Sequence, residues 1–93
     1  MQEHPNVVIY SSGLCGYCSA AKRLLNGKGV EFTEIRIDKE AGMRAEMEQR
    51  SGRTSVPQIF INDTHVGGFD DLSELEAEGT LDELLSGKPA GGS

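Results

Sequence analysis

The chain has 93 residues, which is long enough to bury one modest hydrophobic core and too short for two. Its formal net charge of −6 disfavours nucleic acid and anionic lipid as partners, because both would repel an acidic surface. Apolar runs extend over only a handful of residues, so the sequence predicts no segment that crosses a membrane. We therefore expect a single domain that binds neither nucleic acid nor a membrane.

The first predicted element is a strand over residues 6–10, a short β-branched and aromatic run. A loop at 11–13 separates this strand from a predicted helix, whose apolar residues within 20–25 follow a helical spacing. Both cysteines of the chain, Cys15 and Cys18, lie at the junction between the two elements. This junction is where we expect thiol chemistry.

Cys15 is the candidate nucleophile. A side chain at a helix start lies among unpaired backbone N–H groups and at the positive end of the helix dipole, so the Cys15 thiolate is favoured over its thiol. Cys18 follows three residues later and would face the same side of the first turn. We expect Cys18 to reach Cys15 and close a small disulfide ring.

Three other uses of the two cysteines compete with redox chemistry. A structural disulfide is typical of secreted chains with a signal peptide, whereas this N-terminus has no apolar signal-peptide core. A zinc site would need His4 and His65, which lie far apart in the sequence without neighbouring ligand residues. Both cysteines could also be inert buried side chains. The Cys-x-x-Cys spacing beside a βαβ pattern favours redox chemistry, and the missing export signal favours a cytoplasmic location.

Strands and helices alternate in the next part of the chain. Residues 31–37 alternate polar and apolar side chains and predict an edge strand, after which Asp38 opens a helix that ends at 51–52. Residues 57–61 and 64–66 predict two strands, joined by a tight turn as a hairpin.

Helical patterns fill the rest of the predicted domain. Leucines within 72–75 and within 81–85 supply two apolar faces, and Thr80 is the predicted N-cap of the second helix. We expect one domain over residues 1–87 and a flexible C-terminal tail over residues 88–93.

This order of elements, βαβ followed by a helix, a β-hairpin and further helices, defines the predicted fold class. A right-handed crossover makes the first two strands parallel, and the hairpin adds antiparallel neighbours. We therefore predict an α/β protein with a thioredoxin-like fold, in which helices flank a four-stranded mixed sheet.

Four segments resemble those of a known family. They are residues 8–11, the Cys15-Gly16-Tyr17-Cys18 site, residues 53–61 with their Ser-Val-Pro sequence, and residues 67–72 with their Gly-Gly-x-Asp-Asp sequence. Over about residues 6–85 the chain is similar to glutaredoxins, and in particular to small bacterial dithiol glutaredoxins.

The resemblance implies a glutathione-dependent thiol–disulfide oxidoreductase, with Cys15 and Cys18 as its catalytic residues. It also implies a cis peptide bond before Pro57, which turns the Val56 backbone toward an extended peptide such as glutathione. The residues that would bind glutathione are Tyr17, Arg53, Ser55, Val56, Pro57, Gly68, Asp70 and Asp71.

The resemblance implies a specific role for several of these residues. The Arg53 guanidinium would pair with the glycyl carboxylate of glutathione, because its planar fork matches a carboxylate. Asp70 and Asp71 lie at a helix start whose N–H groups would hold the γ-glutamyl carboxylate, while an aspartate takes the γ-glutamyl ammonium. Tyr17 would pack against the cysteinyl part, and the glycines at 67–68 would permit a close approach.

Two positions depart from the family pattern. Ser12 stands where many dithiol relatives carry lysine, so a cation that would stabilise the Cys15 thiolate is absent. Gly16 stands where many carry proline, which frees the turn beside Cys15. Some glutaredoxins with glycine there bind a [2Fe-2S] cluster between two protomers, using the first cysteine of each and two glutathione thiolates. The alternative function is therefore a cluster-binding homodimer, a carrier or redox sensor with Cys15 as ligand.

The predicted partners are glutathione and proteins that carry disulfides or glutathione mixed disulfides. A dithiol route would use both cysteines, whereas a monothiol route would need only Cys15. We expect a monomer without a metal ion, which dimerises only around a cluster.

Overall fold

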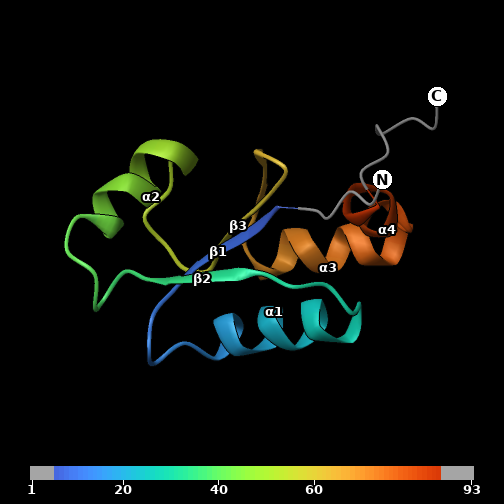
Figure 1. The fold of residues 1–93 in the computed structure, drawn as a ribbon, viewed down its shortest axis with the longest axis horizontal. Helices are drawn as coiled ribbons and strands as arrows, with labels where there is room; N and C mark the ends of the chain where they lie inside the picture. Colours follow the sequence, from blue (N-terminus) through green and yellow to red (C-terminus); the bar gives the residue numbers. More distant parts are fainter. Residues whose placement is uncertain (1–5, 87–93) are drawn as a thin grey trace.

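The computed structural model describes residues 6–86, and its elements follow the predicted order. The strands are β1 (Val7–Ser11), β2 (Thr33–Arg36), β3 (Gln58–Ile61) and β4 (Thr64–Gly67), and the helices are α1 (Gly16–Gly27), α2 (Met43–Ser51), α3 (Phe69–Glu78) and α4 (Thr80–Leu85). In the sheet order β2-β1-β3-β4, β1 and β2 are parallel, whereas β3 is antiparallel to both β1 and β4. The predicted four-stranded mixed sheet is confirmed, with β2 at an edge (Figure 1).

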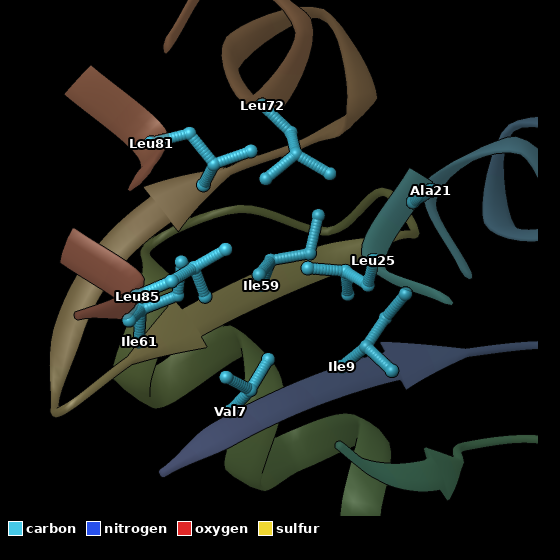
Figure 2. Packing of buried hydrophobic residues seen from close by; sticks show 9 residues of the cluster. All are labelled: Val7, Ile9, Ala21, Leu25, Ile59, Ile61, Leu72, Leu81 and Leu85. Atoms are coloured by element: carbon cyan, nitrogen blue, oxygen red, sulfur yellow. The ribbon is translucent and has the colours of Figure 1, made fainter. Parts of the chain in front are cut away.

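One face of the sheet is covered by α1, α3 and α4. Because side chains alternate along a strand, every second residue of β1 and β3 points to this face. The buried cluster between the layers consists of Val7, Ile9, Ala21, Leu25, Ile59, Ile61, Leu72, Leu81 and Leu85 (Figure 2). Burial of this apolar surface fixes α1, and with it the cysteines at its start, against β1.

Helix α2 covers the opposite face of the sheet (Figure 1). Met47 packs there with Tyr10 and Phe60, whose rings meet edge to face with centroids 5.9 Å apart. The Tyr10 hydroxyl donates to Glu46 at 2.7 Å and accepts from Arg50 at 2.8 Å. Helix α2 is therefore anchored by both apolar and polar contacts, which places the loop that follows it.

The predicted start of the second helix was wrong. Helix α2 begins at Met43, because Gly42 adopts a left-handed conformation with φ of 83° and interrupts the chain before it. Asp38, the expected first residue, accepts the Gly13 N–H at 3.1 Å and pairs with Arg36 through two bonds of 2.9 Å each. This contact ties the loop that leads into α1 to the end of β2.

The predicted cap of the last helix was also wrong. Gly79, with φ of 82°, ends α3 and is itself the N-cap of α4, so Thr80 is the first residue inside α4. In residues 6–86, no helix is both long and apolar enough to cross a membrane. The predicted tail at 88–93 lies outside the described residues, and the domain boundaries stay a prediction.

Candidate active site

Cys15 is the N-cap residue of α1, at the helix start where the sequence places it. Its backbone is extended, and its Sγ accepts the backbone N–H of Cys18 at 3.2 Å. The same thiol lies 3.8 Å from the carbonyl oxygen of Val56, to which it donates. Cys15 is partly exposed, so its sulfur is held between the first turn of α1 and the loop before β3 while it stays open to solvent.

Cys18 is a free thiol, as Cys15 is, but it is only 1% exposed. Burial, followed by the hydrogen bond with Cys15, raises the pKa of the Cys18 thiol to about 12. Cys18 is therefore protonated near neutral pH when both thiols are reduced. The structure supplies a dithiol pair in which one sulfur is accessible and the other is enclosed.

A groove of about 290 Å³ lies beside this pair. Its lining residues are Tyr17, Arg53, Ser55, Val56, Pro57, Gly68, Phe69, Asp70 and Asp71. Every residue expected to bind glutathione is therefore in one place, although that role stays a prediction. Cys15 reaches the groove through its contact with Val56, and the peptide bond between Val56 and Pro57 is cis as expected.

Asp71 is the polar centre of the groove. One carboxylate oxygen, Oδ2, accepts the Gly68 N–H at 3.0 Å and pairs with Arg53 Nη1 at 3.1 Å. The Gly68 N–H, and after it the Arg53 guanidinium, hold the pKa of Asp71 below its ordinary value. Gly67, with φ of 115°, leaves room for this carboxylate, which a Cβ would meet. Gly67 therefore makes space for Asp71, although the sequence suggested space for a ligand.

Phe69 is the groove residue that the sequence analysis missed. Its ring stacks against that of Tyr17, with centroids 6.1 Å apart and an interplanar angle of 26°. Tyr17 is 65% exposed, and Leu14, which directly precedes Cys15 in the sequence, is fully exposed. The sequence does contain a signal for Phe69. It lies between Gly68 and Asp70, which are both predicted binding residues, and it is an aromatic residue at a predicted helix start.

Gln58 is a second missed residue, and it supports the wall of the groove. It is 1% exposed, and its Nε2 donates to the Ser55 carbonyl oxygen at 3.1 Å. Its Oε1 lies 2.8 Å from His65 Nε2. Because an amide oxygen only accepts, His65 must carry its hydrogen on Nε2. The hydrogen bonds that run from His65 through Gln58 to Ser55 therefore hold the loop before β3 in place.

Residues 6–86 contain no set of side chains that could form the zinc site considered above. No group of three or more histidine, cysteine, aspartate or glutamate side chains is arranged there to hold a metal ion. His65 contacts Gln58 and packs on the ring of Phe60 with centroids 4.9 Å apart. His4 lies outside the described residues.

Known proteins resemble this chain in both sequence and structure. A sequence model of the family described as Glutaredoxin matches residues 7–66. Glutaredoxin 3 of Escherichia coli K12 is 58% identical over 80 residues, which cover 86% of this chain and 96% of that protein.

Two solved structures extend this likeness to the fold. The solution structure of glutaredoxin from Brucella melitensis is 53% identical, with a TM-score of 0.80 over 92% of this chain and 95% of that chain. The crystal structure of a buckwheat glutaredoxin–glutathione complex is 32% identical, with a TM-score of 0.83 over 89% of this chain and 78% of that chain.

Proposed function

Because this chain belongs to the glutaredoxin family and is a thiol–disulfide oxidoreductase with a Cys-x-x-Cys dithiol site, we propose that glutathione is its reductant and binds in the groove beside Cys15. One observation carries the proposal. Three separate parts of the sequence line the same groove, namely Tyr17, four residues of the segment 53–57 (Arg53, Ser55, Val56 and Pro57), and residues 68–71. Glutathione is a small anionic peptide, and backbone groups, a guanidinium and a helix N-terminus are the groups that recognise such a ligand.

In the dithiol route, the Cys15 thiolate attacks a protein disulfide. A bond forms between Cys15 Sγ and one substrate sulfur, and the other substrate sulfur leaves with the electron pair of the broken bond. Cys18 then loses its proton and attacks Cys15 Sγ, which expels the remaining substrate sulfur. The substrate is now reduced to two thiols, and two glutathione molecules reduce the Cys15–Cys18 disulfide while they form glutathione disulfide.

In the monothiol route, Cys15 acts without Cys18. The Cys15 thiolate takes the glutathionyl group from a modified protein, whose own thiolate leaves. A second glutathione then attacks the mixed disulfide and departs as glutathione disulfide. The groove supports this route because it would hold the glutathionyl group with its sulfur toward Cys15.

The ion pair between Arg53 and Asp71 suggests how the groove would receive glutathione. Both groups are about half exposed, so the pair is weakly bound in the absence of ligand. Glutathione would replace it with two pairs of the same kind. Arg53 would bind the glycyl carboxylate, and Asp71 would bind the γ-glutamyl ammonium near the start of α3.

Glutathione dependence tests this assignment. We expect Arg53→Ala and Asp71→Ala to raise the glutathione concentration for half-maximal rate by about tenfold, because loss of a charge-assisted contact costs about 1.5 kcal/mol. Reaction of Cys15 with iodoacetamide should stay unchanged, since binding and thiol chemistry are separate here. Arg23→Ala removes an exposed arginine of α1 outside the groove and is the matched control. An unchanged glutathione dependence in both groove variants would exclude these residues from the site.

A second candidate function is a [2Fe-2S] cluster shared by two protomers, and one observation favours it. The position of a Cβ on Gly16 has no atom within 4 Å, so the space next to the partly exposed Cys15 is open. Cys18 is enclosed, which leaves Cys15 as the thiol that could ligate a cluster. Glutathione thiolates and a second protomer would have to supply the other ligands. A bound cluster would supply electron transfer or be passed on as cargo.

Colour and size test the cluster. Anaerobic reconstitution with iron, sulfide and glutathione should give a brown dimer in the wild type and a colourless monomer in Gly16→Pro, which keeps oxidoreductase activity. A colourless wild-type monomer would exclude the cluster and leave the oxidoreductase function intact.

We further propose a cytoplasmic location, a monomeric state without the cluster, and a domain over residues 1–87.

A further inference from the structure

Cys18 has neighbours that the groove does not use, and the first of them is Lys22. Lys22 lies one helical turn after Cys18 on α1, so the two side chains share a face of the helix. Its Nζ pairs with Glu34 Oε2 of β2 at 2.9 Å. The fully buried Ser11 donates its hydroxyl to the same Glu34 oxygen at 2.6 Å.

These contacts fix the ammonium group of Lys22, whose side chain lies on the same helix face as the enclosed Cys18 thiol. The Ser11 hydroxyl, and after it Lys22, lower the pKa of Glu34, so its carboxylate stays ionised and continues to hold Lys22. The side chains of Lys22 and Glu34 are 31% and 29% exposed, which leaves their charges only partly screened by solvent. A long, flexible lysine is thereby kept in one place, although it takes no part in the groove.

The resolving step needs such a cation. In that step Cys18 gives up its proton, its sulfur bonds to Cys15 Sγ, and the substrate sulfur leaves with the electron pair and takes a proton from solvent. Burial opposes the loss of the Cys18 proton, because an enclosed thiolate is poorly solvated. Once Cys15 is part of a mixed disulfide, it no longer carries a negative charge that repels the Cys18 thiolate, but the burial remains.

We propose that Lys22, held by Glu34 and Ser11, is a positioning residue that acts through Cys18 and stabilises its thiolate in the resolving step of the dithiol route. This inference rests on the proposed dithiol route. It predicts that Lys22 affects resolution of the mixed disulfide and leaves the first attack by Cys15 unchanged.

The groups around Cys18 support this role. The Ser12 backbone and the Lys22 charge lower the pKa of Cys18, against the effects of burial and Cys15. Arg36 of β2 is also attracted to the Cys18 thiolate, and its Nε and Nη2 atoms pair with Asp38. Lys22 is the cation on the same helix as Cys18, one turn away, and its charge lowers the pKa of Cys18.

The test follows two release steps in one experiment. Stopped-flow mixing of the reduced protein with one equivalent of a chromogenic aromatic disulfide should release the first chromophore on attack by Cys15 and the second on attack by Cys18. In Lys22→Gln, we expect the second phase to slow about threefold to tenfold at neutral pH, and its pH profile to move upward by about half to one unit. The first phase should keep its rate and amplitude, which also verifies folding.

Two further variants separate charge from packing. Lys22→Arg keeps the cation and should restore the second phase, whereas Lys28→Gln removes another ion-paired lysine of the same chain region and should change neither phase. An unchanged second phase in Lys22→Gln, or a slow second phase in Lys22→Arg, would overturn the inference. Absence of the second phase in the wild type would instead remove the dithiol route itself, together with this inference.

Discussion

The two cysteines lie in one turn of α1, yet the regions around them differ. Cys15 caps the helix, is partly exposed and adjoins a groove lined by aromatic, charged and backbone groups. Cys18 is 1% exposed and lies one helical turn before Lys22, which pairs with Glu34. One region is built for access and the other for enclosure.

This difference assigns an order to the chemistry. A disulfide that arrives from solvent meets Cys15, whereas Cys18 reacts with the Cys15 sulfur once that sulfur is part of a mixed disulfide. Recognition is therefore concentrated on the groove side of the pair, and control of resolution on the β2 side. Residues of the two sides should affect different kinetic steps, which makes the contrast open to experiment.

Replacing each cysteine breaks the contrast most directly and has the largest expected effect. Cys15→Ser should abolish both disulfide reduction and deglutathionylation, because the accessible nucleophile is lost. Cys18→Ser should lose the dithiol route and keep deglutathionylation. Steady-state assays with a protein disulfide and a glutathionylated peptide measure the two activities. Near-normal turnover in Cys15→Ser would show that the nucleophile has been assigned to the wrong cysteine.

Changing the pH should separate the two regions without mutation. Since burial raises the pKa of Cys18 and remains in the mixed disulfide, the Cys18 thiolate is scarce near neutral pH and increases up to about tenfold for each pH unit below its pKa. The ratio of disulfide reduction by the wild type to deglutathionylation by Cys18→Ser should therefore rise between about pH 6 and pH 8. A ratio that stays flat would mean that resolution does not depend on the enclosed thiol.

The sequence predicted the part of the site that depends on local pattern. Cys15 at a helix start follows from the strand and helix on either side of it, and the order of strands follows from the βαβ and hairpin patterns. The start of α2 could not be predicted so well, because Asp38 is held by its neighbour Arg36 and by Gly13, which is 25 residues away. Gly42, which precedes the observed helix start, is a weaker signal than the helical pattern around it.

Contacts between distant residues account for what the sequence missed. Lys22 and Glu34 are 12 residues apart and meet only because β2 pairs with β1 beside α1. Gln58 reads as an ordinary strand residue until the loop it supports is known. Side chains of this kind have no periodic signature, since their partners are set by the packing of whole elements.

Phe69 sharpens the contrast on the groove side. Phe69→Ala should remove the stacked contact with Tyr17 and widen the groove. We expect the glutathione concentration for half-maximal rate to rise about threefold to fivefold, because aromatic pairs contribute about 0.5–1.5 kcal/mol beyond their buried area. The second release phase, which belongs to Cys18, should keep its rate. A change in the second release phase alone would mean that Phe69 acts on Cys18 and not on the groove.

Ser12→Lys has the smallest expected effect. It tests whether a charge added next to the Cys15 region changes the reactivity of Cys15. A cation near Cys15 should stabilise its thiolate and increase its alkylation by iodoacetamide near neutral pH about twofold to fivefold. Raising the salt concentration should reduce the gain, since the added charge is close to solvent. Equal alkylation in the two proteins at low salt would mean that the added lysine does not reach the thiolate.

The packing of helix α4 affects how the protein folds during its synthesis on the ribosome. Leu81 and Leu85 of this last helix complete the cluster that contains Val7 of the first strand (Figure 2). Until α4 has left the exit tunnel, Val7 and Ile61 lack part of their cover, and the nascent sheet keeps an apolar surface that attracts chaperones. The active site therefore becomes stable only after α4 has been synthesised and can pack against the first strand.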